Sequence, residues 1–200
     1  MSHADAILER VNEAKNSLDG FDSHLVGFVA DMVALIVNAY RANRKVVLMG
    51  NGGSAADAQH LAAELVGRFF KERAALEAIA LNTNTSILTS VGNDYGYEHT
   101  FRRQVEALAH EGDVVIGIST SGNSPNVIEA LKEAKRKSCH TIGLTGRSGG
   151  KMKGLVDLCV CAPSTSTPRI QENHILIGHI VCELVEQELF GNSAGQQDSE

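Results

Sequence analysis

Residues 46–58 read VVLMGNGGSAADA, and this stretch joins a short apolar run to a glycine-rich turn and an alanine-rich segment. The run Val46–Met49 is typical of a buried strand, and the alanines that follow Ser54 favour a helix. Glycines allow the backbone N–H groups of the turn to face a ligand, and the N-terminus of a helix carries partial positive charge. The stretch therefore predicts an anion site between a strand and a helix.

Four more short apolar runs predict further strands. They are Ala78–Leu81, Val114–Ile118, Thr141–Leu144 and Leu158–Cys161. Helical periodicity occurs around 104–109, 126–136 and 170–189, with a short helical turn at 86–91. Strands that alternate with helices indicate an α/β fold with a five-stranded parallel sheet covered on both faces. Ligands of such sheets bind beyond the carboxyl ends of the strands, where the loops at Gly50, Ser119, Gly146 and Ser164 fall.

The chain has the length of a single domain. The apolar pattern before Asn43 is helical, so we expect two helices within residues 1–42. The main part of the domain then covers 43–190. The small, polar segment 191–200 is expected to be a flexible tail.

Composition and charge narrow the classes of partner. A net charge of −6 and a pI near 5.7 give no electrostatic reason to expect nucleic acid or an anionic membrane. Residues 1–5 lack the pattern of a signal peptide, and no apolar run approaches the ~20 residues of a membrane span. We therefore expect a cytoplasmic protein. Cys139, Cys159, Cys161 and Cys182 show no CxxC spacing, which favours reduced core cysteines over a redox or metal role.

A second polar loop, Ser119–Ser124, follows a predicted strand and precedes Pro125, a suitable first helical residue. Its hydroxyls and backbone amides can hold a phosphate without a lysine, although an ordinary turn has the same composition. Two such loops at one sheet edge favour the phosphate site. The first loop lacks the third glycine of GxGxxG, and the sequence has no GxxxxGK[ST] loop. These absences argue against a nucleotide and for a small sugar phosphate.

His60 and Glu64 are four residues apart and share one helix face, as surface pairs also do. Gln171 and His179 on the last long helix can complete a set of four zinc ligands with nitrogen and oxygen donors. These two residues lie eight apart, about 12 Å along a helix axis. Either both side chains lean toward one ion, or different subunits supply them.

Two further polar positions have two interpretations each. Asp94, after Asn93, either caps the next helix or binds sugar hydroxyls. Arg169 is either a phosphate partner or a solvated surface charge.

Segments 50–58, 59–68, 119–124 and 169–179 together resemble the SIS domains of the phosphoheptose isomerase family. The resemblance covers nearly the whole chain, and GNGGSAADAQH and RIQE with His179 are its most specific parts. It implies conversion of D-sedoheptulose 7-phosphate to D-glycero-D-manno-heptose 7-phosphate, the first step toward the ADP- or GDP-heptose of bacterial lipopolysaccharide core or capsule. It also implies cytoplasmic homotetramers with one zinc per subunit, active sites between subunits, and N-terminal helices (1–42) that pack in the oligomer.

The resemblance assigns a role to each matching position. The implied substrate contacts are Asn51, Gly52, Gly53, Glu64, Asn93, Asp94, Ser119, Thr120, Ser121, Ser124 and Gln171. The implied zinc ligands are His60, Glu64, Gln171 and His179. Ketose–aldose exchange moves a proton from C1 to C2 through a cis-enediol. We assign the base to Glu64 and proton transfer between the two oxygens to His179, with zinc or Gln171 stabilising the enediolate.

One carboxylate cannot easily be both zinc ligand and base, because zinc lowers its basicity. Either Glu64 leaves the metal during turnover, or zinc is mainly structural. The alternative of another class is a non-catalytic SIS protein that binds a partner such as the DnaA initiator. Such relatives lack the catalytic Glu and His, so Glu64 and His179 favour the enzyme. A sugar-phosphate sensor would need an attached DNA-binding domain, and none is expected in these residues.

Overall fold

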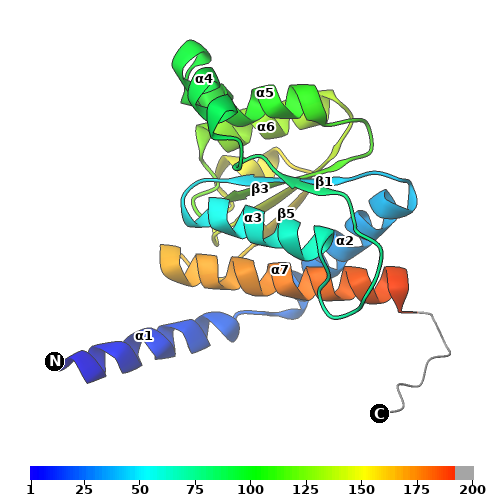
Figure 1. The fold of residues 1–200 in the computed structure, drawn as a ribbon. Helices are drawn as coiled ribbons and strands as arrows, with labels where there is room; N and C mark the ends of the chain where they lie inside the picture. The colour runs from blue at the N-terminus through cyan, green and yellow to red at the C-terminus, as the bar shows by residue number, and fades with distance from the viewer. Residues whose placement is uncertain (192–200) are drawn as a thin grey trace.

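The computed structural model describes residues 1–191 as a three-layer α/β domain (Figure 1). The strands are β1 (Val46–Gly50), β2 (Ala78–Ala80), β3 (Val114–Ser119), β4 (His140–Thr145) and β5 (Leu158–Cys161). The α-helices are α1 (His3–Leu18), α2 (Ser23–Arg41), α3 (Gly53–Val66), α4 (Thr85–Tyr95), α5 (Thr100–Leu108), α6 (Pro125–Arg136) and α7 (Thr167–Phe190). Short 3-10 turns occupy Tyr97–His99 and Gly150–Gly154. The α/β fold expected from the sequence is confirmed.

All five strands are parallel, in the order β2-β1-β3-β4-β5. The central strands β1 and β3 are buried along their whole length, as continuous apolar runs in a parallel sheet require. Since the order reverses direction at β1, the loops after β1 and β3 lie at the topological switch point. The two polar loops of the sequence therefore meet at one edge.

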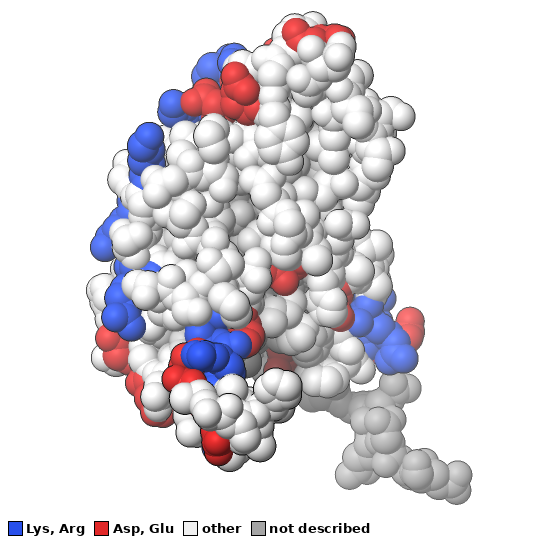
Figure 2. Space-filling view, turned by 90° about the vertical axis from the view of Figure 1, so that its left-hand side faces the viewer, with Lys and Arg blue, Asp and Glu red and all other residues white. Residues whose placement is uncertain are grey.

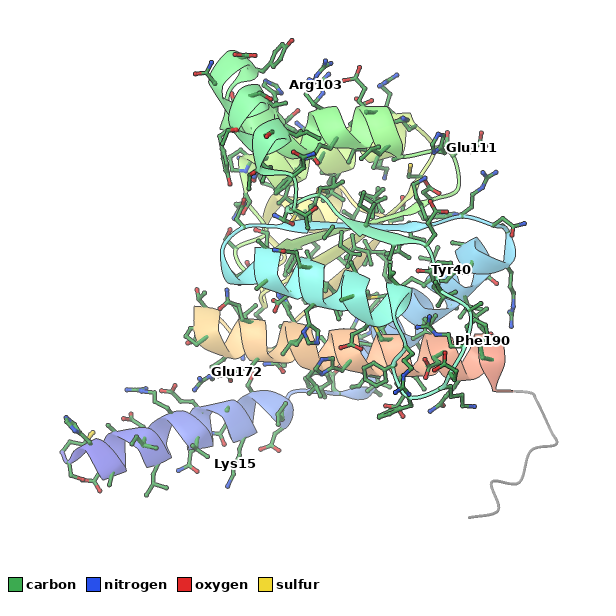
Figure 3. All side chains as sticks on the ribbon, viewed as in Figure 1. Lys15, Tyr40, Arg103, Glu111, Glu172 and Phe190 are labelled. Atoms are coloured by element: carbon green, nitrogen blue, oxygen red, sulfur yellow. The ribbon has the colours of Figure 1, made fainter. Side chains whose placement is uncertain are left out.

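Two separate cores cover the two faces of the sheet. The larger joins α2, α3 and α7 to the sheet through residues such as Met32, Leu61 and Ile177. The smaller packs α5 and α6 on the opposite face around Phe101 and Leu131. Side chains fill both layers, and Tyr40 and Phe190 lie at the same end of the molecule (Figure 3). Helices α3 and α7 are thus fixed side by side.

The two N-terminal helices behave differently. Helix α2 buries Leu25, Met32 and Ile36 against the sheet, whereas α1 extends from the body and buries only Ser17 (Figure 1). Contrary to the sequence-based expectation, one described helix, α2, is long and apolar enough to cross a membrane by length and composition. Its buried apolar face is that of a core helix.

Two other expectations change in detail, and a third is not tested. The predicted turn at 86–91 is a full helix, α4, because Asn84 caps it and the helix continues through Asn93 and Asp94 to Tyr95. All four cysteines are free thiols, but only Cys139 and Cys182 are buried, and Cys159 and Cys161 are half-buried. The tail prediction for 191–200 concerns, beyond Gly191, residues outside those that the structure describes.

Candidate active site

The turn after β1 is shaped by glycine. Gly52 has a φ of +58°, a conformation that side-chain-bearing residues rarely adopt, and it begins α3 without a side-chain cap. Helices α6 and α7 also begin without a side-chain cap, whereas α1, α2 and α4 are capped by Ser2, Asp22 and Asn84. Helix α5 is uncapped as well, but the uncapped starts of α3, α6 and α7 follow β1, β3 and β5. Three helix N-termini at the carboxyl edge of the sheet therefore have amide groups available for an anion.

Helix α7 packs directly against this turn. A Cβ on Gly53 would lie 2.5 Å from Nε2 of Gln171, so any other residue there would displace the Gln171 amide. The structure thus brings Gln171 to the start of α3. Asn51 is held by a reciprocal amide pair with Asn126, both bonds measuring 2.9 Å, and the Tyr97 hydroxyl donates to it at 3.1 Å.

The second loop presents a cluster of hydroxyls. Ser119 Oγ lies 2.8 Å from Ser124 Oγ and 3.5 Å from Ser121 Oγ. Gly122 has a φ of +65°, and a Cβ there would lie 2.1 Å from the carbonyl oxygen of Gly149, so the loops after β3 and β4 touch. A cavity of about 260 Å³ opens beside them and is lined by Thr120, Ser121, Asn123, Gly146, Arg147, Ser148, Ser164, Thr165 and Ile170. The loops following β3, β4 and β5 all contribute to it.

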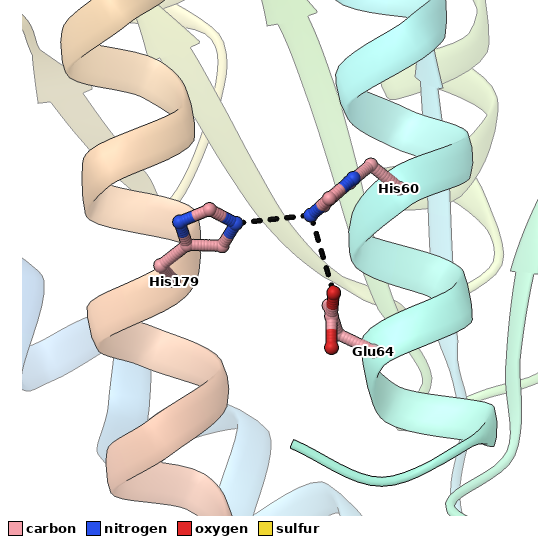
Figure 4. Close-up of side chains that lie close together, drawn as sticks. All are labelled: His60, Glu64 and His179. Atoms are coloured by element: carbon pink, nitrogen blue, oxygen red, sulfur yellow. Dashed lines mark hydrogen bonds and ion pairs between the residues drawn. The ribbon is translucent and has the colours of Figure 1, made fainter. Parts of the chain in front are cut away.

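A second cluster lies deeper along α3 (Figure 4). His60 Nε2 lies 2.9 Å from His179 Nε2 and 3.2 Å from Glu64 Oε1. His60 and Glu64 come from one face of α3, and His179 faces them from α7 of the same chain. The side chains of His60 and Glu64 are 48% and 26% exposed, so the cluster can be reached from solvent.

These three side chains fit a metal ion. One ligand atom from each lies within 4.8 Å of the others, and among the described residues this is the one such group of three. Two imidazole nitrogens and a carboxylate oxygen are zinc donors, and a zinc site of this kind keeps a position for substrate or water. Gln171, the fourth predicted ligand, lies instead at Gly53, about seven residues or 10 Å nearer the N-terminus of α3.

Asp57 occupies the same side of α3, one turn before His60. Its Oδ2 is buried without a hydrogen-bond partner, and burial raises the pKa of this carboxyl, with His60 opposing the shift. An unpaired carboxyl oxygen beside the cluster is costly, and the sequence contained no signal for it.

Other predicted positions lie elsewhere. Asn93 and Asp94 are exposed in the last turn of α4, where the Asn93 amide donates to Asp94 at 2.8 Å, so Asp94 does not cap a following helix. Arg169 is not a solvated surface charge, because its side chain is 14% exposed and donates to the Arg10 carbonyl of α1 at 2.7 Å; a role as phosphate partner stays a prediction. His174 is buried at the Thr145 carbonyl, 3.0 Å away, and burial lowers its pKa, in agreement with a structural role.

Sequence patterns gave no indication of three residues that shape the turn. Asn126 and Tyr97 hold Asn51, and the Asn82 amide donates to the Gly50 carbonyl at 2.7 Å. Their roles become visible only in the structure, because each contacts a residue 30 or more positions away in the sequence.

The comparisons with known proteins agree with this geometry. The SIS domain family matches residues 10–146. The phosphoheptose isomerase of Geobacter sulfurreducens is 56% identical over 186 residues, covering 93% of this chain and 98% of the relative. That of Pelobacter propionicus is 63% identical over 162 residues, 81% of this chain and 86% of the relative.

Solved structures give the same result. The phosphoheptose isomerase GmhA from Neisseria gonorrhoeae superposes with a TM-score of 0.88 at 42% identity, covering 93% of this chain and all (100%) of that one. A phosphoheptose isomerase from Francisella tularensis gives a TM-score of 0.90 at 35% identity, covering 94% and 100%. The chain has a glycine turn between a strand and a helix, and it aligns over most of its length with phosphoheptose isomerases. This chain therefore belongs to the phosphoheptose isomerase family of SIS-domain proteins.

Proposed function

We propose that this isomerase converts D-sedoheptulose 7-phosphate to D-glycero-D-manno-heptose 7-phosphate, the first step toward ADP- or GDP-heptose for bacterial surface polysaccharides. The observation that carries the proposal is the pairing of an anion-binding edge with the His60–Glu64–His179 cluster, about 10 Å along α3. A linear seven-carbon sugar phosphate has a comparable length. Its phosphate can therefore sit at the helix N-termini while its carbonyl end reaches the cluster.

Binding at the edge uses the loops in specific ways. The amides of Gly52 and Gly53, with the Ser119, Ser121 and Ser124 hydroxyls, supply short donors to phosphate. Thr120 and Asn51 lie in the same two loops and bind the adjoining sugar oxygens. Gln171, packed on Gly53, fixes the sugar chain between the two ends of the site. Asn93 and Asp94, exposed in the last turn of α4, are the remaining proposed contacts to the sugar.

We assign proton transfer to the His60–Glu64–His179 cluster. Glu64 removes the C1 proton of the ketose, which gives a cis-enediol, and returns a proton to C2. His179 moves a proton between the oxygens on C1 and C2, since its ring nitrogen points into the same space (Figure 4). His60 holds both groups in position through its contacts at 2.9 Å and 3.2 Å.

Zinc is the proposed metal, one ion per subunit, with His60, Glu64 and His179 as ligands and Gln171 as the fourth; Glu64 would leave the ion to act as base, unless the ion is structural. Such an ion supplies Lewis-acid stabilisation of negative charge on the sugar oxygens. Because Gln171 lies at the other end of the site in this chain, its contribution requires a shift of its side chain or a second subunit.

A homotetramer with active sites between subunits completes the proposal. Helix α1 leaves Ile7, Leu8 and Val11 exposed at 62%, 62% and 45%, and α4 buries no residue. Helices with so little intramolecular burial are natural subunit contacts. We place the protein in the cytoplasm, with no nucleic-acid or membrane partner, because its net charge is −6; in Figure 2 the Lys and Arg residues lie mainly along one side, with Asp and Glu among them.

The direct test is to incubate the purified protein with sedoheptulose 7-phosphate, with and without zinc, and to follow aldose heptose phosphate by NMR. We expect product in the presence of protein, and faster formation with zinc if the metal takes part in turnover. Absence of product from folded, zinc-loaded protein would contradict the proposal and favour a partner-binding role of the DnaA-associated kind. A matched reaction with sedoheptulose, which lacks phosphate, should give much less product.

A further inference from the structure

A thiol pair lies at the free edge of the sheet, away from the isomerase cluster. Cys159 and Cys161 are on one face of β5, the last strand of the described sheet, which pairs with β4. Their sulfur atoms are 3.7 Å apart, and the Thr145 hydroxyl donates to Cys161 Sγ at 3.4 Å. Both side chains are half-buried, unlike those of Cys139 and Cys182.

The pair opens into a cavity of about 410 Å³. Its wall is formed by the α1–α2 connection, the start of α2, and the segment that enters and follows β5. The charged and titratable groups on this wall are Asp22, His24, Arg147, Lys153 and Asp157. Two carboxylates balance two cations, so a divalent cation is not repelled from the cavity.

The two thiols share their protons unequally. The hydrogen bond from Cys159 lowers the pKa of the Cys161 thiol to about 6 against the effect of burial, with Thr145 and Lys153 assisting. The same bond and burial raise the pKa of Cys159. Thiolate is the form of cysteine that ligates metals.

Geometry favours a bridging metal over a disulfide. Residues two apart on a strand have Cα atoms separated by roughly 6.6–6.8 Å, the outer limit for a disulfide. Two thiolates on a tetrahedral metal with bonds of about 2.3 Å are separated by about 3.8 Å. The observed 3.7 Å spacing matches the metal without any movement of β5.

We propose that Cys159 and Cys161 form a binding site for a soft divalent metal ion, zinc or its heavier congener cadmium, held by two thiolates at the edge of the sheet. Binding forms two metal–sulfur bonds and releases the thiol protons to solvent. Water in the cavity supplies the remaining ligands. The site is chemically distinct from the His60–Glu64–His179 cluster, whose donors are nitrogen and oxygen only.

Cadmium(II) titration of the reduced, metal-free protein tests this proposal, with the thiolate-to-cadmium charge-transfer band in the ultraviolet as the readout. We expect a saturable band at a single ion per chain. The band should be lost in Cys159→Ser and in Cys161→Ser, and retained in His179→Gln, because the histidine cluster has no thiolate. Cys139→Ala is the matched control, since Cys139 is buried against the His110 carbonyl.

A wild-type protein that shows no such band at stoichiometric cadmium overturns the proposal, whatever the variants do. A band that persists in Cys161→Ser but disappears in Cys139→Ala or Cys182→Ser overturns it as well. Circular dichroism of each serine variant establishes that loss of the band does not reflect unfolding. Isomerase activity is not the readout, so failure of the proposed function would leave this test unaffected.

Discussion

At the scale of single residues, two side chains carry the proposed chemistry. Glu64→Gln and His179→Gln keep the size of each side chain but remove the base and the proton carrier. We expect each to lower kcat by roughly 10²–10⁴-fold with little change in fold or phosphate affinity. Steady-state kinetics and circular dichroism measure both effects.

The matched control for Glu64→Gln is Glu72→Gln, the same chemical change at a carboxylate whose side chain is 91% exposed. It should leave kcat unchanged. Substantial activity in Glu64→Gln or His179→Gln would remove the role assigned to that residue.

Gly122 sets the geometry of the hydroxyl loop. Alanine there must adopt a positive φ, which costs about 1–3 kcal/mol, and its Cβ would clash with the Gly149 carbonyl. We expect Gly122→Ala to lower the free energy of unfolding and to raise KM. Urea denaturation measures the first effect, and kinetics the second.

Gly27→Ala is the counterpart. Gly27 lies in α2 with nothing within 4 Å of the added carbon, so alanine should stabilise the protein by about 0.5–1 kcal/mol. If Gly122→Ala raised the free energy of unfolding, as Gly27→Ala should, the proposed clash and strain at Gly122 would be contradicted.

At the scale of elements, α7 holds the segment that follows α3. Glu186 is 2% exposed and accepts hydrogen bonds from the amides of Phe69, Phe70 and Lys71 at 2.7–2.9 Å, and it pairs with Arg73 at 3.1 Å. Glu186→Ala would leave Arg73 buried without its partner, at a cost of about 3–5 kcal/mol. Chemical denaturation checks this value. Glu188→Ala, which breaks an exposed pair with Arg41, should cost less than about 1 kcal/mol.

The same carboxylate predicts a pH dependence. Burial raises the pKa of Glu186, but the backbone amides and Arg73 outweigh it, and the folded-state pKa lies below the ordinary value of 4.5. Its contribution to stability is therefore present above about pH 4.5 and is lost as the pH falls through the lowered pKa. Unfolding free energies measured from pH 7 down to acid should decline less in Glu186→Ala than in the wild type. Parallel declines would contradict this assignment.

At the scale of the whole molecule, helix α1 makes too few contacts within its own chain to bury its apolar side chains. Its inner end is tied to α7 by Ser17–Asn173 and by Arg169, but Ile7 and Leu8 face solvent. We expect Leu8→Glu to reduce the assembly size measured by light scattering. Asn12→Glu adds the same charge at an exposed polar position of α1 and should not. A monomeric wild type would contradict the proposed tetramer.

The sequence by itself determined the alternation of strands and helices, the glycine turn at 50–54 and the pairing of His60 with Glu64, because these follow from local periodicity and spacing. The extent of α4 was missed, since its Thr, Ser, Val, Gly and Asn residues are weak helix formers and it buries no residue. Only the tertiary structure shows that His179 of the same chain lies beside His60 and that Gln171 lies against Gly53, not beside the histidines. It also turned Arg169 toward α1 and gathered Asn126 and Tyr97 around Asn51. Such contacts depend on how α3 and α7 pack across the sheet edge, and no local pattern encodes that packing.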